Sequence, residues 1–123
     1  PIPAPLGLAN ILLGGSGFGS FSPGVTGGFG LQNLGLLVRV WGQVTQIGDG
    51  SLYINDGSGL ADGTLTGGQP NVGVRVVCNP TGYAPGDYVQ VTGVSSCFQS
   101  AVGRIARRIL VRGPADLREL DIP

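Results

Sequence analysis

From residue 36 onward, apolar and polar side chains alternate in short runs separated by turn-forming residues. In the first run three valines share one face: Val38, Val40 and Val44. Arg39 and Trp41 fall on the opposite face. Because successive side chains of a β-strand point to opposite faces, this pattern predicts a strand over residues 36–47 with the valines buried. Trp41 is therefore expected to point away from the core.

The same reasoning predicts four further strands, over residues 51–56, 72–78, 87–95 and 103–112. Asp49 and Gly50 form a tight turn that joins the first two strands into a β-hairpin. The polar stretch 57–71 is expected to be a loop. The segment 79–86 is rich in proline and glycine and too short for a helix of any length. Residues 115–122 form a short tail with one helical turn.

Strand parity also predicts which side chains form the core. The inward positions are Leu52, Ile54, Val72, Val74, Val76, Cys78, Val89, Val91, Gly93, Cys97, Ile105, Ile109 and Val111. Tyr53 and Arg75 fall on the outward face. Gly42 is expected to mark a bulge or bend in the first strand, and Arg107, which breaks the parity of the last strand, is expected to mark a second bulge. The fold class is therefore all-β.

Three stretches of the body resemble the OB fold, a five-stranded barrel. They are Val40-Trp41-Gly42-Gln43-Val44, Leu52-Tyr53-Ile54-Asn55-Asp56-Gly57-Ser58-Gly59 and Pro85-Gly86-Asp87-Tyr88-Val89-Gln90-Val91-Thr92-Gly93. The resemblance covers about residues 36–112 and implies an OB-like barrel of the kind found in secreted or surface proteins of bacteria. The chain departs from it by lacking the helix that many OB domains carry between the third and fourth strands.

Residues 1–35 differ from this body and are predicted to form an extended arm rich in glycine and proline, so that residues 36–123 make up the barrel and its tail. The arm also carries apolar residues that favour contact with another surface: Ile2, Leu6, Leu8, Ile11, Leu13 and Phe18. It is therefore not a plain linker. Gly7-Leu8-Ala9-Asn10 resembles Gly30-Leu31-Gln32-Asn33, a match too short to support a prediction.

The composition of the chain limits the kinds of catalysis and metal binding that it can support. The chain has no histidine, which excludes Ser-His-Asp and Cys-His catalysis and most zinc sites. Asp49, Asp56 and Asp62 raise the alternatives of a calcium site or a paired-carboxylate glycosidase, but Asp-Gly pairs are first of all turn formers. We therefore expect no enzyme activity, no cofactor and no metal.

Cys78 and Cys97 are the only cysteines, and their inward parity favours a disulfide over two free thiols. The chain contains no methionine, so it begins after a cleavage or was trimmed from a longer polypeptide. These features favour an extracellular or cell-surface location. No apolar run is long enough to span a bilayer.

Two functions follow as hypotheses. In the first, the protein is structural: the arm adds as a strand to a sheet edge of a neighbouring copy, and repeated head-to-tail contacts build filaments. In the second, it is a binding module for single-stranded nucleic acid or oligosaccharide, whose ligand face comprises Arg39, Trp41, Tyr53 and Arg75. A net charge of zero argues against binding to a phosphate chain. We expect the same four side chains to be covered by the arm or by a neighbouring copy.

Overall fold

The structure of the protein is a computed structural model. It describes residues 4–17, 24–28, 30, 32–101 and 104–120, so Ile2 and Phe18 of the predicted arm contacts lie outside the described residues. The protein is mainly β, and the described residues contain no α-helix. The predicted all-β class is confirmed.

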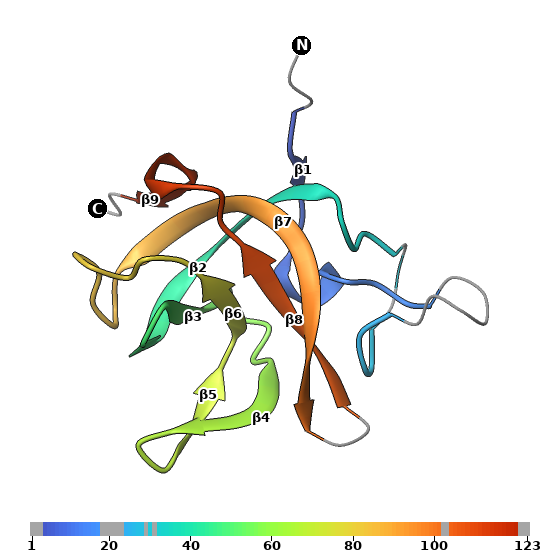
Figure 1. Ribbon diagram of the computed structural model, residues 1–123, viewed down its shortest axis with the longest axis horizontal. Helices are drawn as coiled ribbons and strands as arrows, with labels where there is room; N and C mark the ends of the chain where they lie inside the picture. Colours follow the sequence, from blue (N-terminus) through green and yellow to red (C-terminus); the bar gives the residue numbers. More distant parts are fainter. Residues whose placement is uncertain (1–3, 18–23, 29, 31, 102–103, 121–123) are drawn as a thin grey trace.

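Five strands form a closed ring of hydrogen bonds (Figure 1). They are β2 (Leu37–Gly48), β3 (Ser51–Asn55), β6 (Val74–Val77), β8 (Arg104–Leu110) and β7 (Tyr88–Ala101), in that order around the ring. The β6–β8 pair is parallel, and the other four pairs are antiparallel. These strands correspond to the five that the alternation of apolar residues predicts, although β7 extends well beyond residue 95.

The ring closes because its two longest strands change partner along their length. The first half of β2 pairs with β7, from Leu37 opposite Val94 to Gln43 opposite Tyr88, and its second half pairs with β3. In the same way β7 leaves β2 at Val94 and pairs with β8 from there onward. The first halves of β2 and β7 pair with each other along one edge, so within the ring the other edge of each first half stays free for a further strand.

The core lies inside the ring and consists mainly of aliphatic side chains. The inward predictions are confirmed for Val38, Val40, Val44, Leu52, Ile54, Val74, Val76, Val89, Val91 and Ile109, all of which are buried. Four further inward predictions are only partly buried: Cys78, Cys97, Ile105 and Val111. Val72 is wrong, because it is 36% exposed and belongs to a different strand. Gly73 separates that strand from β6 at a φ of 110°, where a Cβ atom would lie 1.9 Å from the carbonyl oxygen of Ile54. Only glycine fits at this turn, and the turn ends the alternation.

The predicted loop over residues 57–71 is instead a second, two-stranded sheet, so this prediction is wrong. It consists of β4 (Ala61–Thr66) and β5 (Gln69–Val72), which pair in antiparallel fashion. Its sequence, ADGTLTGGQPNV, lacks the alternation of apolar residues that marks a strand with a buried face. Hydrogen bonds and polar contacts hold this hairpin together. The alternation of apolar residues along the sequence does not reveal such contacts.

Neither predicted bulge lies where the sequence suggested. Gly42 belongs to a regular stretch of the β2–β7 pairing, and the irregularity in β2 lies between Val44 and Gln46. Gly42 serves a close approach instead, because a Cβ atom there would lie 2.9 Å from the Cβ atom of Ile54. The pairing of β8 is likewise regular at Arg107, and the shift falls between Gln99 and Ala101.

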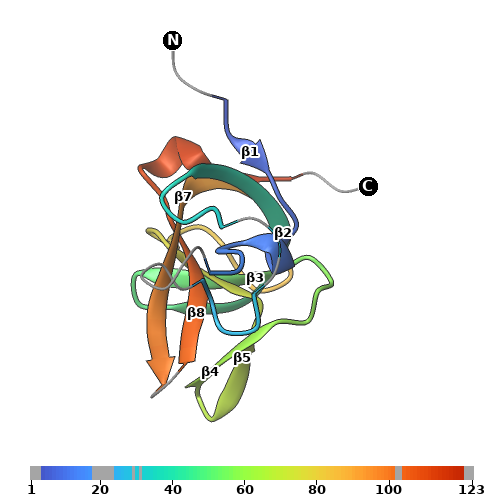
Figure 2. The same ribbon diagram turned by 90° about the vertical axis from the view of Figure 1, so that its right-hand side faces the viewer.

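Two short strands extend the ring at its free edges; both are labelled in Figure 1, and the first can also be followed in Figure 2. Near the N-terminus, β1 (Leu6–Gly7) pairs in parallel with β2, and a 3₁₀ turn, η1 (Asn10–Leu12), follows it. In the tail, the predicted helical turn is the 3₁₀ turn η2 (Pro114–Asp116), and it leads into an additional strand, β9 (Leu117–Glu119), that pairs with β7. β1 and β9 thus flank the β2–β7 pair from opposite sides.

Candidate functional site

The described part of the arm docks on the body of its own chain. β1 adds to the free edge of β2, with Leu6 level with Val38, and the backbone N–H of Leu8 donates to the carbonyl of Arg39 at 3.1 Å. Further along, Leu13 is fully buried and belongs to the hydrophobic core, and Leu8 packs against that core. Ile11 is partly buried. The arm is therefore a structural part of the ring.

The start of η1 is held by a reciprocal pair of hydrogen bonds. The backbone N–H of Asn10 donates to Asp56 Oδ2 at 2.8 Å, and the backbone N–H of Asp56 donates to Asn10 Oδ1 at 3.1 Å. Asn10 Nδ2 also donates to the carbonyl of Trp41 at 3.3 Å. Burial acts to raise the pKa of Asp56, but hydrogen bonds from the Ser58 side chain and from backbone N–H groups outweigh it and hold that pKa below its usual range.

The end of η1 is held by a guanidinium group. Arg107 of β8 donates from Nε to the carbonyl of Leu13 and from Nη2 to the carbonyl of Ile11, both at 3.0 Å. Burial lowers the pKa of Arg107, and among the described residues no carboxylate forms an ion pair with it. Its charge is instead matched by the carbonyl oxygens at the end of a helical turn, where partial negative charge gathers.

Asn33 holds the chain where the arm returns to the body. Its Oδ1 accepts from the backbone N–H of Gly14 at 2.7 Å and from the Ser95 hydroxyl at 2.8 Å, and its Nδ2 donates to the carbonyl of Leu12 at 2.8 Å. Asn10 and Asn33 are both buried, and they occupy equivalent places in the two short sequences that resemble each other. That resemblance was the one sequence signal for these anchors.

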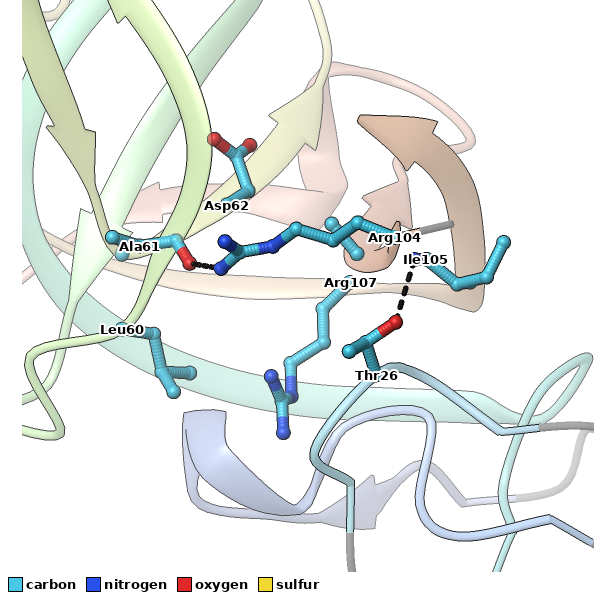
Figure 3. A pocket seen from close by; sticks show the side chains of 9 residues that line it. Thr26, Leu60, Ala61, Asp62, Arg104, Ile105 and Arg107 are labelled. Atoms are coloured by element: carbon cyan, nitrogen blue, oxygen red, sulfur yellow. Dashed lines mark hydrogen bonds between the residues drawn. The ribbon is translucent and has the colours of Figure 1, made fainter. Parts of the chain in front are cut away.

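The returning segment also contacts β8 directly, beside the Arg107 contact (Figure 3). The Thr26 hydroxyl accepts from the backbone N–H of Ile105, and the Thr26 N–H donates to the carbonyl of Ile105, both at 2.8 Å. Arg104 reaches across to the carbonyl of Ala61 in β4. The hollow between these groups measures about 20 Å³, which is room for about one water molecule. It is a packing gap.

Three large apolar side chains of β1, of β2 and of the residue before β2 are exposed. Leu6 is 49% exposed, Leu36 is 51% exposed, and Trp41 is 46% exposed. The prediction that Trp41 points outward is confirmed. Among the described residues, β1 pairs on one side only, so its other backbone edge is open beside these side chains.

The four residues of the predicted ligand face fall into two separate places. Arg39 and Trp41 lie on the outer face of β2, where Arg39 Nε donates to Thr92 Oγ1 of β7 at 3.2 Å. Tyr53 and Arg75 lie opposite each other on β3 and β6, beside the β4–β5 hairpin. The structure brings each pair together but does not unite the two pairs.

The β4–β5 hairpin covers Tyr53. This side chain is 4% exposed, and its hydroxyl donates to Asp62 Oδ2 at 2.5 Å, lies 2.9 Å from Thr64 Oγ1 and accepts from Arg75 Nε at 2.9 Å. Burial, followed by the hydrogen bond to Asp62, raises the pKa of Tyr53. Tyr53 thus holds a second layer of structure and does not offer a stacking surface.

The predicted disulfide is absent, since Cys78 and Cys97 are both free thiols. Cys78 follows β6 and Cys97 lies in β7, and β8 runs between these two strands. Two strand spacings separate the thiols by roughly 10 Å across the sheet, more than a disulfide spans. Parity correctly assigns side chains to a face, but it does not say which strands are neighbours.

The aspartates had raised two further alternatives, a calcium site and a pair of catalytic carboxylates. Among the described residues, no group of three or more His, Cys, Asp and Glu side chains could hold a metal ion. Asp56 and Asp62 bond to different partners and do not converge. In the described part of the chain, no helix has the length and apolar character needed to cross a membrane.

Comparison with known proteins places no further constraint on the site. No protein-family model matches the chain, and no curated protein is significantly similar to it. The function must therefore be argued from the geometry of the chain itself.

Proposed function

We propose that this chain is an OB-like barrel domain with a structural role, and that its copies associate by exchanging their N-terminal arms. The strand order of the ring and the parallel pairing of its third and fifth strands support an OB-like barrel. The fold alone does not select a function. The functional proposal rests on the way in which the arm docks on the ring.

The arm occupies an acceptor site that a second copy possesses as well. Its contacts are a strand on the edge of β2, a buried position for Leu13, and hydrogen bonds with Asp56, Asn33 and Arg107. Every one of these contacts would form unchanged if the arm came from a neighbouring copy. Strand addition of this kind supplies affinity through main-chain hydrogen bonds and register through side-chain sites.

The later part of the arm, which connects its docked residues 4–13 to the body, suits such an exchange. Residues 14–30 contain Gly14, Gly15, Gly17, Gly19, Gly24, Gly27, Gly28 and Gly30, which gives this connection few conformational restrictions. If each copy passes its arm to the next, the contact is head-to-tail and the assembly stays open, which produces filaments. Zero net charge and the exposed Leu6, Leu36 and Trp41 favour association over repulsion.

Engineered cross-linking distinguishes an exchanged arm from one that stays on its own body. Gly7 and Arg39 are paired positions, both exposed, so Gly7→Cys with Arg39→Cys places one thiol on the arm and one on its acceptor. The background carries Cys78→Ser and Cys97→Ser. After oxidation of concentrated protein, arm exchange gives a ladder of covalent multimers on a denaturing gel.

The matched control pairs Gln90→Cys with Arg118→Cys, two facing positions of β7 and β9 that lie outside the arm. This variant should give monomers alone. Monomers from the arm variant as well, at every concentration tested, would overturn the proposal. Electron microscopy of the intact chain beside a variant that lacks residues 1–15 then tests whether the assemblies are filaments.

A second candidate function rests on the exposure of Trp41. Trp41, Gln90 and Arg118 are register partners across β2, β7 and β9, so the indole lies in one outward row with an amide and a guanidinium. Such a row suits stacking of a nucleobase or a sugar ring. Trp41→Ala should then weaken binding to oligothymidylate or to an oligosaccharide array and leave the cross-linked ladder unchanged. No binding by the intact chain would exclude this role.

A location outside the cytoplasm remains part of the proposal. The two free thiols remove the support that a disulfide would have supplied.

A further inference from the structure

A cavity of about 410 Å³ opens at one end of the strand ring. Its lining comes from the ends of β6 and β8, from the connection between β6 and β7, and from the start of β9: Cys78, Asn79, Thr81, Tyr83, Val111, Arg112, Gly113, Pro114 and Leu117. This volume falls within the range of small-molecule sites.

The cavity exists because no helix closes this end of the ring. Residues 78–87 join β6 to β7 through turns alone, and the segment after β8 forms only the short turn η2. Cys78 and Val111 continue the inward parity of β6 and β8 and pack against the core, and Leu117 belongs to the core. The floor of the cavity is therefore the hydrophobic core itself.

Hydrogen bonds hold the walls of the cavity in place. The Tyr83 hydroxyl donates to the carbonyl of Leu117 at 3.1 Å and ties one wall to the other. On the far wall, Arg112 and Asp116 form a two-fold hydrogen-bonded ion pair at 2.8 and 3.0 Å, which encloses Gly113 and Pro114. A site whose walls are tied in this way needs little ordering when a ligand binds.

The lining also defines the chemistry of an occupant. Burial raises the pKa of the Cys78 thiol, which keeps it protonated at neutral pH, and Asp116 already neutralises the one cation of the lining. The Asn79 side chain accepts from Thr81 through Oδ1. No hydrogen bond from its Nδ2 occurs in the described part of the chain, and Asn79 is exposed, so this amide is a donor available at the rim of the cavity.

From these observations we infer that the cavity binds a small, uncharged, mainly apolar molecule. Its apolar part lies against Cys78, Val111 and Leu117, and a hydrogen-bond acceptor on it meets Asn79. None of the lining residues takes part in the arm contacts, so the inference is independent of arm exchange.

The uncharged fluorophore N-phenyl-1-naphthylamine is a suitable probe for the cavity. We expect saturable binding at one probe per chain, with a rise in fluorescence on transfer to an apolar site. In a Cys97→Ser variant, saturating probe should slow the alkylation of Cys78 by N-ethylmaleimide about fivefold or more, because the thiol lines the same cavity. Unsaturable binding, or alkylation at an unchanged rate, would overturn the inference.

Gly113→Trp tests the location without a change to the core. Gly113 has an extended backbone with a φ of −174°, and its Cβ position is open, so an indole there projects into space beside the cavity. We expect about tenfold weaker probe binding or more. Leu65→Trp adds the same side chain at an exposed position on β4 and should bind as the unaltered chain does. Equal binding by the two variants, each confirmed as folded by circular dichroism, would overturn the proposed location.

Discussion

Three polar side chains help to hold the arm to the body, beside the buried Leu13. Arg107, Asn33 and Asn10 each bond to backbone groups of a segment far away in the sequence. A buried polar group that loses its partner costs more than the net value of the bond that it made. Each of these side chains therefore makes the docked position specific as well as stable.

Arg107→Met should release the end of η1. Methionine keeps the apolar stem but removes both donors to the carbonyls of Ile11 and Leu13. We expect a loss of about 2 kcal/mol in the free energy of unfolding in urea, and faster hydrogen exchange at the N–H of Leu8. Arg118→Met, at an exposed position of β9, is the control and should change neither quantity. Slow exchange at Leu8 in the Arg107 variant would contradict this role.

Asp56 should contribute to the fall in the free energy of unfolding at acid pH. Its pKa is lowered in the folded chain, so its stabilising effect is complete above the unfolded value of about 4 and is lost as the pH falls through the folded pKa. In Asp56→Asn, the free energy of unfolding should therefore fall less steeply below about pH 4. An unchanged acid slope would show that the bond from Asn10 does not depend on the charge.

Asp116 serves as the comparison for Asp56. The pKa of Asp116 is lowered chiefly by its exposed partner Arg112, so the contribution of that pair should shrink in high salt. The contribution of Asp56 should persist in high salt, because backbone N–H groups and a hydroxyl supply its bonds.

At the scale of elements, three short pieces are added to the ring, and they attach to it by two kinds of contact. β1 and β9 extend the free edges of β2 and β7 through main-chain hydrogen bonds. The β4–β5 hairpin instead attaches through side chains, with Tyr53 bonded to Asp62 and Thr64. The hairpin should therefore respond to a change at one hydroxyl group.

Tyr53→Phe removes that hydroxyl and keeps the ring. The buried Asp62 carboxylate and Arg75 Nε each lose a partner. We expect a loss of about 1–3 kcal/mol in the free energy of unfolding. Tyr88→Phe is the matched control, because no hydrogen bond of the Tyr88 hydroxyl occurs among the described residues. Equal stability of the two variants would mean that the hairpin does not depend on Tyr53.

At the scale of the whole molecule, the zero net charge and the open edges of the sheet both favour contact between copies. The ring has β1 at one free edge and β9 at the other, beside exposed apolar side chains. Net charge is what normally keeps small soluble domains apart, and this chain has none. If copies exchange arms as proposed, the contact between them consists of hydrogen bonds and the apolar contacts of Leu8 and Leu13, with no ion pair among the described residues.

Assembly should accordingly depend little on salt. We expect the mass distribution from light scattering after size-exclusion chromatography to be nearly the same at low and at high sodium chloride, because few of the arm contacts are between opposite charges. A marked fall in mass at high salt would point to an ionic interface and contradict arm exchange.

Alternation alone was enough to locate the five ring strands, the tight turn at Gly50 and ten core positions, because inward residues of a strand must be apolar. It missed the β4–β5 hairpin, whose residues are mostly polar and small. It placed Tyr53 on the outward face, to be covered by the arm or by a neighbouring copy, whereas the β4–β5 hairpin of the same chain covers it. Parity describes one strand and not what later covers it. The arm anchors had only weak signals, a broken parity for Arg107 and a short repeat for Asn10 and Asn33, and neither indicated a contact with the arm.

By itself, therefore, the sequence determined the all-β class, the faces of the strands and the low charge that favours association, because these depend on local period and composition. Only the tertiary structure decided that the arm docks on the ring, that the two thiols lie apart, that Tyr53 is covered and that one end of the ring is open. Each of these depends on which distant segments become neighbours, and the closure of the ring by β2 and β7 sets those neighbours.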